Sequence, residues 1–291
     1  MLHTRLCDLL GIDVPIVQAP VAAGTELALA VASAGGLGML QGSWLPVAEI
    51  APLLDSVAGE NIGINFVLAW PQEERFEHAL EAGAHIISIA WGDAAPFVRR
   101  THAANAVLMA SVSSAEEARK AEAAGVDVIV AQGWEAGGHV WGDVATMALV
   151  PAVVDAVSIP VIASGGIADG RGIAAAFALG AEGVWLGTRF VASLESPHVY
   201  KERIVAANET DARHTMVFAS DWAAPHRVLR NRALDVGKSR PYAPPASAAE
   251  LDTAALYAGQ SAGLVNEIKP AAEIVRDLVA ETDAALLVAA G

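Results

Sequence analysis

The sequence predicts an α/β fold in which eight parallel strands, each followed by a helix, close into a (β/α)8 TIM barrel. Short apolar or β-branched runs alternate with helical patterns and start roughly every 22 residues, which fits one strand, one helix and two short loops. Strict alternation implies a parallel sheet, and eight near-equal units favour closure over the alternative, an open doubly wound sheet. The predicted strands cover residues 15–20, 37–40, 63–68, 85–90, 106–112, 127–132, 160–166 and 182–188.

The alanine-rich helices between these strands carry start and stop signals. A serine pair at 113–114, followed by glutamates at 116–117, predicts a capped helix start. Gly83, Gly125 and Gly180 each follow an alanine or leucine just before the next strand, where a helix C-cap needs a left-handed residue. This repetition indicates a repeated strand–helix unit.

The repeat is lost after Ala207, and we expect a small helical cap over residues 208–260. A closing helix is expected from about 271 to 289, so the barrel domain would comprise residues 1–207 and 261–291. The expected cap holds the proline-rich stretch PYAPPAS and a basic cluster. We expect that cluster to be a solvated face, with binding of an anionic substrate or nucleotide as the alternative. It consists of Arg227, Arg230, Arg232, Lys238 and Arg240.

Composition limits the partners of the protein. The chain has 291 residues, 54% of them hydrophobic, and a formal net charge of −15. This provides a full core, and it makes nucleic acid and anionic membranes unfavourable partners because both bind cationic surfaces. Cys7 is the single cysteine, so neither an internal disulfide nor a cysteine metal cluster is expected, and no metal is assigned. With no apolar run long enough to span a bilayer, we expect a soluble cytoplasmic protein, a monomer or a homodimer.

Two glycine loops follow neighbouring predicted strands, Ser164-Gly165-Gly166 and Gly187-Thr188. In α/β barrels the loops after the last two strands often hold a phosphate. Glycines let backbone N–H groups approach phosphate oxygens, and a following helix N-terminus and the Thr188 hydroxyl would add to the site. The loops therefore predict a phosphate site, with a simple tight turn as the alternative. The phosphate could belong to a sugar phosphate or to a flavin.

Neutral amides stand at the ends of three other predicted strands, namely Gln18, Asn65 and Gln132. Their donors and acceptors suit the edge of an isoalloxazine or a pyrimidine, with loop capping as the alternative for each. A sugar-phosphate isomerase would more often place a lysine or several carboxylates there, whereas the four lysines of this chain lie elsewhere. The amides therefore favour a flat, neutral heterocycle.

The long loop at residues 133–143 places one histidine, His139, among glycines over the predicted barrel mouth. Long loops in compact folds are usually functional. An imidazole titrates near neutral pH, so His139 could take a proton from a carbon acid or bind a substrate anion, with loop packing as the alternative. The histidines at 198, 214 and 226 fall in the C-terminal segments and are less favoured.

The sequence resembles the FMN-dependent nitronate monooxygenases, a group that also includes flavin enoyl-ACP reductases and NADH:quinone reductases. The similar stretches are PIVQAPVAAGTELALAVASAGGLGML, GINFVL, AQGWEAGGH, PVIASGGIADGRGIAAAFALGAEGVWLGTRF and YAGQSAGLV, spread over nearly the whole chain. The order of EAGGH before GGIADGRG and LGTRF is specific. Val21, where many members have methionine, and Trp91 depart from the pattern and bear on the substrate more than on the cofactor.

The resemblance implies FMN as cofactor and His139 as the active-site histidine, acting as base or nitronate partner. Residues 257–263 would line the cofactor or substrate side. By the same resemblance, the FMN contacts would come from Gln18, Ala19, Asn65, Gln132, Gly137, Gly138, Ser164, Gly165, Gly166, Gly187 and Thr188.

The implied reaction is the oxidation of an alkyl nitronate, a small-molecule substrate, by dioxygen to a carbonyl compound and nitrite. The alternative on the same scaffold is NAD(P)H-dependent reduction of an enoyl thioester or a quinone. A barrel that binds a phosphate ligand without catalysis is a third possibility.

Overall fold

The computed structural model describes residues 2–220, 222–241 and 244–290; positions 221, 242 and 243 of the expected cap lie outside the described residues. One eight-stranded parallel sheet forms the centre of the structure, in the order β1-β9-β8-β6-β5-β4-β3-β2. All eight predicted strands are confirmed. They are β1 (Ile16–Gln18), β2 (Gly38–Gln41), β3 (Ile62–Val67), β4 (Ile86–Ala90), β5 (Val107–Val112), β6 (Val128–Gln132), β8 (Val161–Ser164) and β9 (Gly183–Leu186).

The sheet closes on itself between β1 and β2. The N–H of Leu37 donates to Ile16 O at 2.9 Å, and the N–H of Gln18 donates to Leu37 O at 2.8 Å. The buried side chain of Gln18 continues this seam, because its Oε1 accepts from the N–H of Met39 at 3.2 Å. The open-sheet alternative is therefore excluded, and the fold is the expected TIM barrel.

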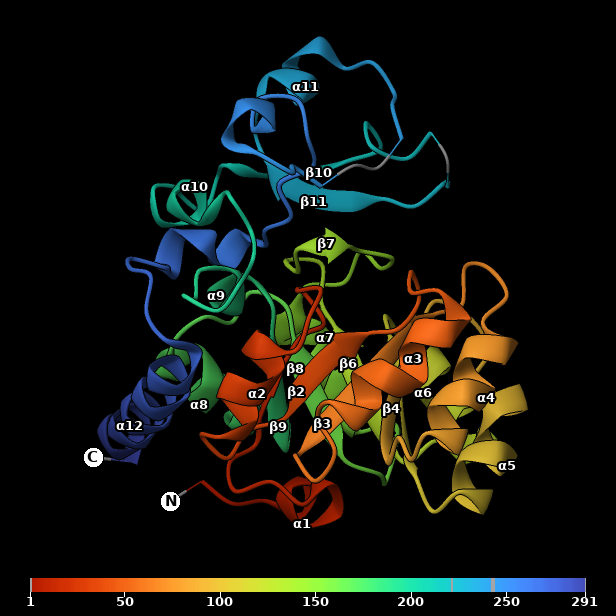
Figure 1. The fold of residues 1–291 in the computed structure, drawn as a ribbon. Coiled ribbons are helices and arrows are strands. Elements are labelled where there is room, and N and C mark those ends of the chain that lie inside the picture. The colour runs from red at the N-terminus through yellow and green to blue at the C-terminus, as the bar shows by residue number, and fades with distance from the viewer. Residues whose placement is uncertain (1, 221, 242–243, 291) are drawn as a thin grey trace.

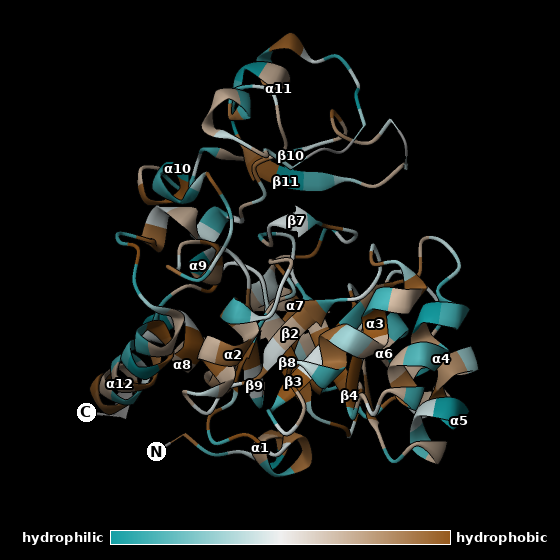
Figure 2. Ribbon diagram, in the orientation of Figure 1, coloured by the Kyte–Doolittle hydropathy of each residue, from teal (hydrophilic) through white to brown (hydrophobic). Residues whose placement is uncertain are grey.

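A ring of helices surrounds the sheet (Figure 1), and Figure 2 shows both hydrophobic and hydrophilic residues on them. The expected closing helix is present as the last member of this ring and packs beside the helices that follow β1 and β8. The ring consists of α2 (Glu26–Ala32), α3 (Val47–Asp55), α4 (Glu73–Glu81), α5 (Ala95–Ala103), α6 (Ala115–Ala124), α7 (Thr146–Val154), α8 (Gly170–Ala178) and α12 (Ala271–Ala290).

Local signals define the helix ends as the sequence predicts. The Ser114 hydroxyl accepts from the N–H of Glu117 at 3.2 Å and so caps the helix, while the Glu117 carboxylate accepts from the N–H of Ser113, one residue before the cap. Gly83, Gly125 and Gly180 all have φ between +85° and +98°. A residue with a Cβ is strained in this left-handed conformation, which explains glycine at these helix ends.

The barrel interior is a packed core rather than a pore. Side chains such as Met39, Met109 and Trp185 fill it in one buried cluster, as is usual for this architecture. Helix α1 (Arg5–Leu10) covers its N-terminal end and contributes Leu6 and Cys7 to the same cluster. Cys7 therefore lies at the end of the barrel opposite to the loops that follow the strands.

Between β9 and α12 the chain leaves the barrel and forms further elements, which include η2 (Gln260–Leu264) and lie mostly above the barrel mouth in Figure 1. The segment at 208–260 contains helical turns, but also two strands, so it is less helical than the sequence suggests. Its alternation of polar and apolar residues is too short to reveal strands. The elements are α9 (Thr188–Val191), α10 (Lys201–Val205), β10 (Ala212–Thr215), β11 (His226–Leu229), α11 (Arg232–Val236) and η1 (Ala248–Glu250).

A second, antiparallel sheet joins this segment to the long loop at 133–143. Its order is β10-β11-β7, where β7 (Gly138–His139) belongs to that loop. The register places His139 directly opposite His226 and Gly138 opposite Arg227. The second sheet thus fixes the long loop above the barrel, while the division into a barrel domain and a cap domain stays a prediction.

Candidate active site

Two backbone loops lie side by side at the C-terminal ends of β8 and β9, because these strands pair in register up to Ser164. Gly165 and Gly166 have φ of +101° and +74°, values that glycine adopts without strain. Within the described ranges, four N–H groups of these loops donate to no backbone carbonyl, namely those of Gly165, Gly166, Gly187 and Thr188.

The Thr188 hydroxyl adds a fifth donor to this edge. Its Oγ1 accepts from the N–H of Gly259 at 2.8 Å, which leaves the hydroxyl proton to donate elsewhere. The N-terminus of α8 offers a phosphate fewer N–H donors than the sequence suggests. The Asp169 carboxylate already caps this helix by accepting from the N–H of Gly172 at 3.0 Å. Five donors on two neighbouring loops fit a phosphate group, and the Glu135 side chain beside Gly166 is already bonded to Thr146.

The three strand-end amides have different local partners. Asn65 is buried, and its Nδ2 donates to the hydroxyl of Ser88, its neighbour on β4, at 2.7 Å. Gln132 Nε2 donates to His139 O at 3.1 Å and so ties β6 to the long loop. The Gln18 amide serves the seam between β1 and β2, donating to Ala19 O and accepting from Met39. Ala19 is buried beside β9.

Glu135 has a structural role in the long loop. Its carboxylate accepts from the N–H of Thr146 at 2.8 Å and so caps α7. The Thr146 hydroxyl lies 2.9 Å from Gly165 O, which links this cap to the first glycine loop. A Cβ on Gly137 would lie 2.4 Å from Gly259 N, so the long loop and the segment at 257–263 approach each other closely, as the resemblance implies.

Arg227 is buried and anchors the same loop instead of facing solvent. Its guanidinium donates to Trp134 O at 2.7 Å and to Ala136 O at 3.1 Å, and it stacks over the Trp134 ring. The basic cluster is therefore not one solvated face, because Arg227 is buried while Arg230 is exposed. Arg230 pairs with Asp235 on the exposed side.

A chain of hydrogen bonds runs from the second sheet to His139. His226 Nε2 donates to Phe218 O at 2.8 Å, which leaves His226 Nδ1 to accept from the Tyr257 hydroxyl at 2.9 Å. The Tyr257 oxygen must then accept from His139 Nε2, also at 2.9 Å. With His226 neutral, this network places the proton of neutral His139 on Nε2.

His139 is a neutral imidazole at physiological pH. Burial, together with the nearby His226, lowers the pKa of His139 from 6.5 to about 3. A conjugate acid this strong makes the neutral ring a weak general base toward carbon acids. The arrangement instead offers a ring of fixed orientation that can take up a proton together with a bound anion.

Aromatic rings surround His139. The Trp222 indole stacks on it at a centroid distance of 4.4 Å and an interplanar angle of 20°. Trp91 meets it edge-on at 5.2 Å, and its φ of +60° is rare for a residue with a bulky side chain. Such an outlier at a binding site indicates a conformation held by its surroundings.

The structure brings together His139 and Tyr257, both of which the sequence singles out, with other residues that it does not single out. His226 was disfavoured because it lies in the C-terminal segment, yet β11 carries it opposite His139. Trp222 and Trp70 were not singled out, although seven tryptophans against three tyrosines is an unusual ratio that could have directed attention to them.

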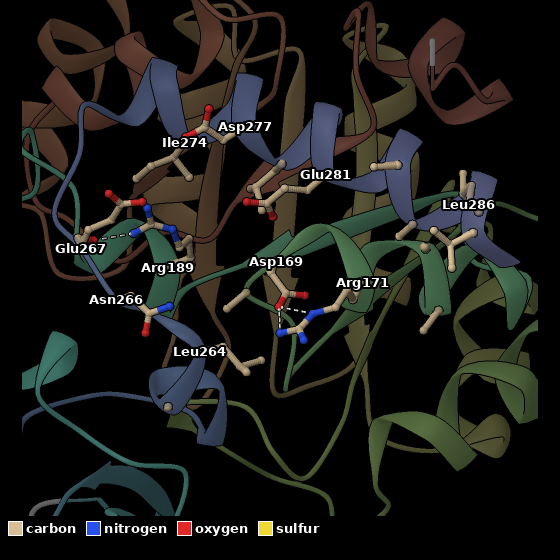
Figure 3. A pocket seen from close by; sticks show the side chains of 18 of the residues that line it. Asp169, Arg171, Arg189, Leu264, Asn266, Glu267, Ile274, Asp277, Glu281 and Leu286 are labelled. Atoms are coloured by element: carbon tan, nitrogen blue, oxygen red, sulfur yellow. Dashed lines mark hydrogen bonds and ion pairs between the residues drawn. The ribbon is translucent and has the colours of Figure 1, made fainter.

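A separate groove of about 1100 Å³ lies on the outer side of the barrel between α8, α12 and η2. Figure 3 shows Asp169 paired with Arg171 on one side and Arg189 donating to Glu267 O on the other. The groove contains neither glycine loop nor His139, so it is separate from the candidate site at the barrel mouth.

The family model described as nitronate monooxygenase matches residues 45–281 of the chain. The chain belongs to the nitronate monooxygenase family. It is 38% identical over 245 residues to a Mycobacterium tuberculosis protein, a match that covers 80% of this chain and 68% of the relative. That relative is named (3aS,4S,5R,7aS)-5-hydroxy-7a-methyl-1-oxo-octahydro-1H-indene-4-carboxyl-CoA dehydrogenase.

Two solved structures resemble this nitronate monooxygenase family member over nearly their whole length. FabK from Thermotoga maritima has a TM-score of 0.90 and 35% identity, covering 100% of this chain and 99% of that one. Nitroalkane oxidase from Streptomyces ansochromogenes has a TM-score of 0.84 and 28% identity, covering 98% and 99%. Both likenesses agree with the barrel described above.

Membership makes the chain an oxidoreductase, the class to which its named relatives belong. Proteins of this family are flavoproteins in general. No helix among the described residues combines the length and the apolar character that a membrane crossing needs.

Proposed function

We propose that this protein binds FMN and oxidises alkyl nitronates with dioxygen, giving a carbonyl compound and nitrite. The observation that carries the cofactor is the pair of glycine loops, whose Gly166, Gly187 and Thr188 N–H groups have no backbone acceptor among the residues that the structure describes. A flavin phosphate would supply these acceptors. Asn65, two residues before the end of β3, and Gln132, the last residue of β6, would lie on the side of the flavin ring.

A bound flavin would supply the redox chemistry, with the nitronate as the species oxidised and dioxygen as the oxidant. The protein binds and orients the nitronate and shields it from water. For this role the aromatic surroundings of His139 are suited, because they exclude solvent on several sides of the imidazole.

His139 acts in this proposal as the partner of a preformed nitronate. Protonated His139 would be an imidazolium that attracts the anion by its charge while Nε2 keeps its bond to Tyr257. Because burial lowers the pKa of the ring, the proton is taken up together with the anion. Since neutral His139 is a weak base, a neutral nitroalkane should be turned over far more slowly than its nitronate.

The test compares nitroethane with ethylnitronate on the FMN-loaded protein, with nitrite as the readout. We expect ethylnitronate to be the better substrate by kcat/KM, and His139→Asn to keep the flavin while losing most nitronate turnover. Unchanged nitronate turnover in His139→Asn would remove the histidine from the mechanism. Absence of nitrite with both substrates in the wild type would overturn the proposed reaction.

A second candidate is NAD(P)H-dependent reduction of an enoyl thioester or a quinone. The likeness to FabK over the whole chain and the 38% identity to a dehydrogenase named for a CoA ester favour it. The basic cluster gives it less support, because Arg227 is buried among loop carbonyls. Anaerobic mixing with NADH, NADPH or ethylnitronate separates the two, since rapid bleaching of the flavin by a pyridine nucleotide alone supports reduction.

A further inference from the structure

Five of the seven tryptophans of the chain form one continuous array at the barrel mouth. Trp91 lies 4.9 Å from Trp222 and 5.1 Å from Trp141, measured between ring centroids. Trp222 in turn contacts Trp70 at 4.9 Å, and Trp70 contacts Trp44 at 5.5 Å. The edge-on and tilted angles between these rings are the favourable ones for aromatic pairs.

The array stands across the barrel from the glycine loops. Trp44, Trp70 and Trp91 follow β2, β3 and β4 in turn. In the closed strand order, β3 and β4 are opposite to β8 and β9, which carry the loops. A ligand held at the loops and extending over the mouth would therefore reach His139 and then the indoles.

One end of the array is open to solvent. Trp141 is 57% exposed, and Trp91 next to it is partly exposed, so both can receive a ligand. At the inner end, Trp222 covers His139, and in the described part of the chain its buried Nε1 has no hydrogen-bond partner. A contiguous exposed apolar patch often marks a binding site, and a buried donor without an acceptor is costly.

We infer that the substrate carries a flat aromatic or conjugated ring, which packs against Trp91 and Trp141 while its reacting group lies at His139. This deepens the proposed function by naming a substrate class, and it rests on the substrate entering at the barrel mouth. Indoles stack on flat rings through dispersion and quadrupole terms that a saturated ring of equal size cannot match. Trp91, held at φ +60°, is the fixed wall of this site.

The test is equilibrium binding to the protein as purified with its cofactor, measured by isothermal titration calorimetry. The probes are naphthalene-2-methanol and decahydronaphthalene-2-methanol, which share a skeleton but differ in flatness. Because the saturated probe is the more hydrophobic, simple burial would favour it. We expect the flat probe to bind about tenfold more tightly, and equal binding or a preference for the saturated probe would overturn the inference.

Two exposed indoles provide a matched pair of variants. Trp141→Leu should reduce the preference for the flat probe several-fold, whereas Trp44→Leu, at a position 48% exposed at the far end of the array, should leave it unchanged. Equal effects of both substitutions, or none in Trp141→Leu, would contradict the site. Both positions are on the surface, so folding is preserved, and the visible flavin spectrum checks it.

The outcomes separate this inference from the proposed reaction. If the preference is observed but no nitronate is oxidised, the reaction fails and the ring site stands. If nitronates are oxidised but the flat probe shows no preference, the ring site fails and the reaction stands.

Discussion

Replacing His139 by glutamine should make the protein less sensitive to acid. The ring has a pKa of about 3 in the folded protein against 6.5 when unperturbed. The unfolded chain therefore binds a proton at His139 below about pH 6.5, whereas the folded protein does not until about pH 3. The stabilisation from the neutral ring is complete above pH 6.5 and is lost as the pH falls toward 3.

The magnitude follows from the width of this window. At pH 5 the solution is about 1.5 pH units below the pKa of the ring in the unfolded chain. Proton binding therefore stabilises the unfolded state, and lowers the free energy of unfolding, by at most about 2 kcal/mol between about pH 7.5 and pH 5. His139→Gln removes the titrating ring. The drop in unfolding free energy between pH 7.5 and pH 5 should therefore be smaller in the variant than in the wild type, by at most about 2 kcal/mol.

The assay is urea unfolding at both pH values, followed by far-ultraviolet circular dichroism. His139→Asn is the matched control, since it also lacks a titrating ring and should show the same pH dependence as His139→Gln even if its absolute stability differs. If the unfolding free energy falls by the same amount in the wild type and in both variants between pH 7.5 and pH 5, His139 is not a neutral, buried ring.

Three further substitutions test the contacts around the site. Tyr257→Phe removes the hydroxyl shared by His139 and His226 and should lower the unfolding free energy by about 1–3 kcal/mol in urea titrations, while full stability would disprove the hydrogen-bond chain. Arg227→Met leaves two loop carbonyls without their donor and should cost about 2–3 kcal/mol by the same assay, with weaker FMN binding; wild-type values for both would contradict its anchoring role. Asp169→Ala removes the cap of α8 and should cost about 1 kcal/mol, seen as a lower Tm, without changing FMN binding; a higher flavin affinity, from loss of a carboxylate that competes for the same N–H groups, would place the phosphate at that helix instead.

The barrel was predictable because its signals are local. Each strand and its following helix repeat within about 22 residues, and glycines such as Gly125 mark the turns by their own backbone preference. Even the closing helix, α12, has a long amphipathic pattern that needs no partner to be visible. The second sheet lacks such signals, because β7 has two residues and pairs only through its contact with β11.

The active site was partly predictable for the same reason. The glycine loops and His139 stand in short motifs, whereas Tyr257 is 118 residues from His139 and only the fold brings them together. His226 has no motif of its own, and its role depends on the register of β11. The neutral state of His139 follows from burial, which the sequence does not reveal.

The most direct test of the account is the affinity of the protein for FMN compared with riboflavin, which lacks the phosphate, measured by calorimetry after removal of bound flavin. Backbone donors at Gly166, Gly187 and Thr188 would contact the phosphate alone, so FMN should bind at least about a hundredfold more tightly than riboflavin. Equal affinity for the two flavins, or no binding of either, would contradict the assignment of these loops.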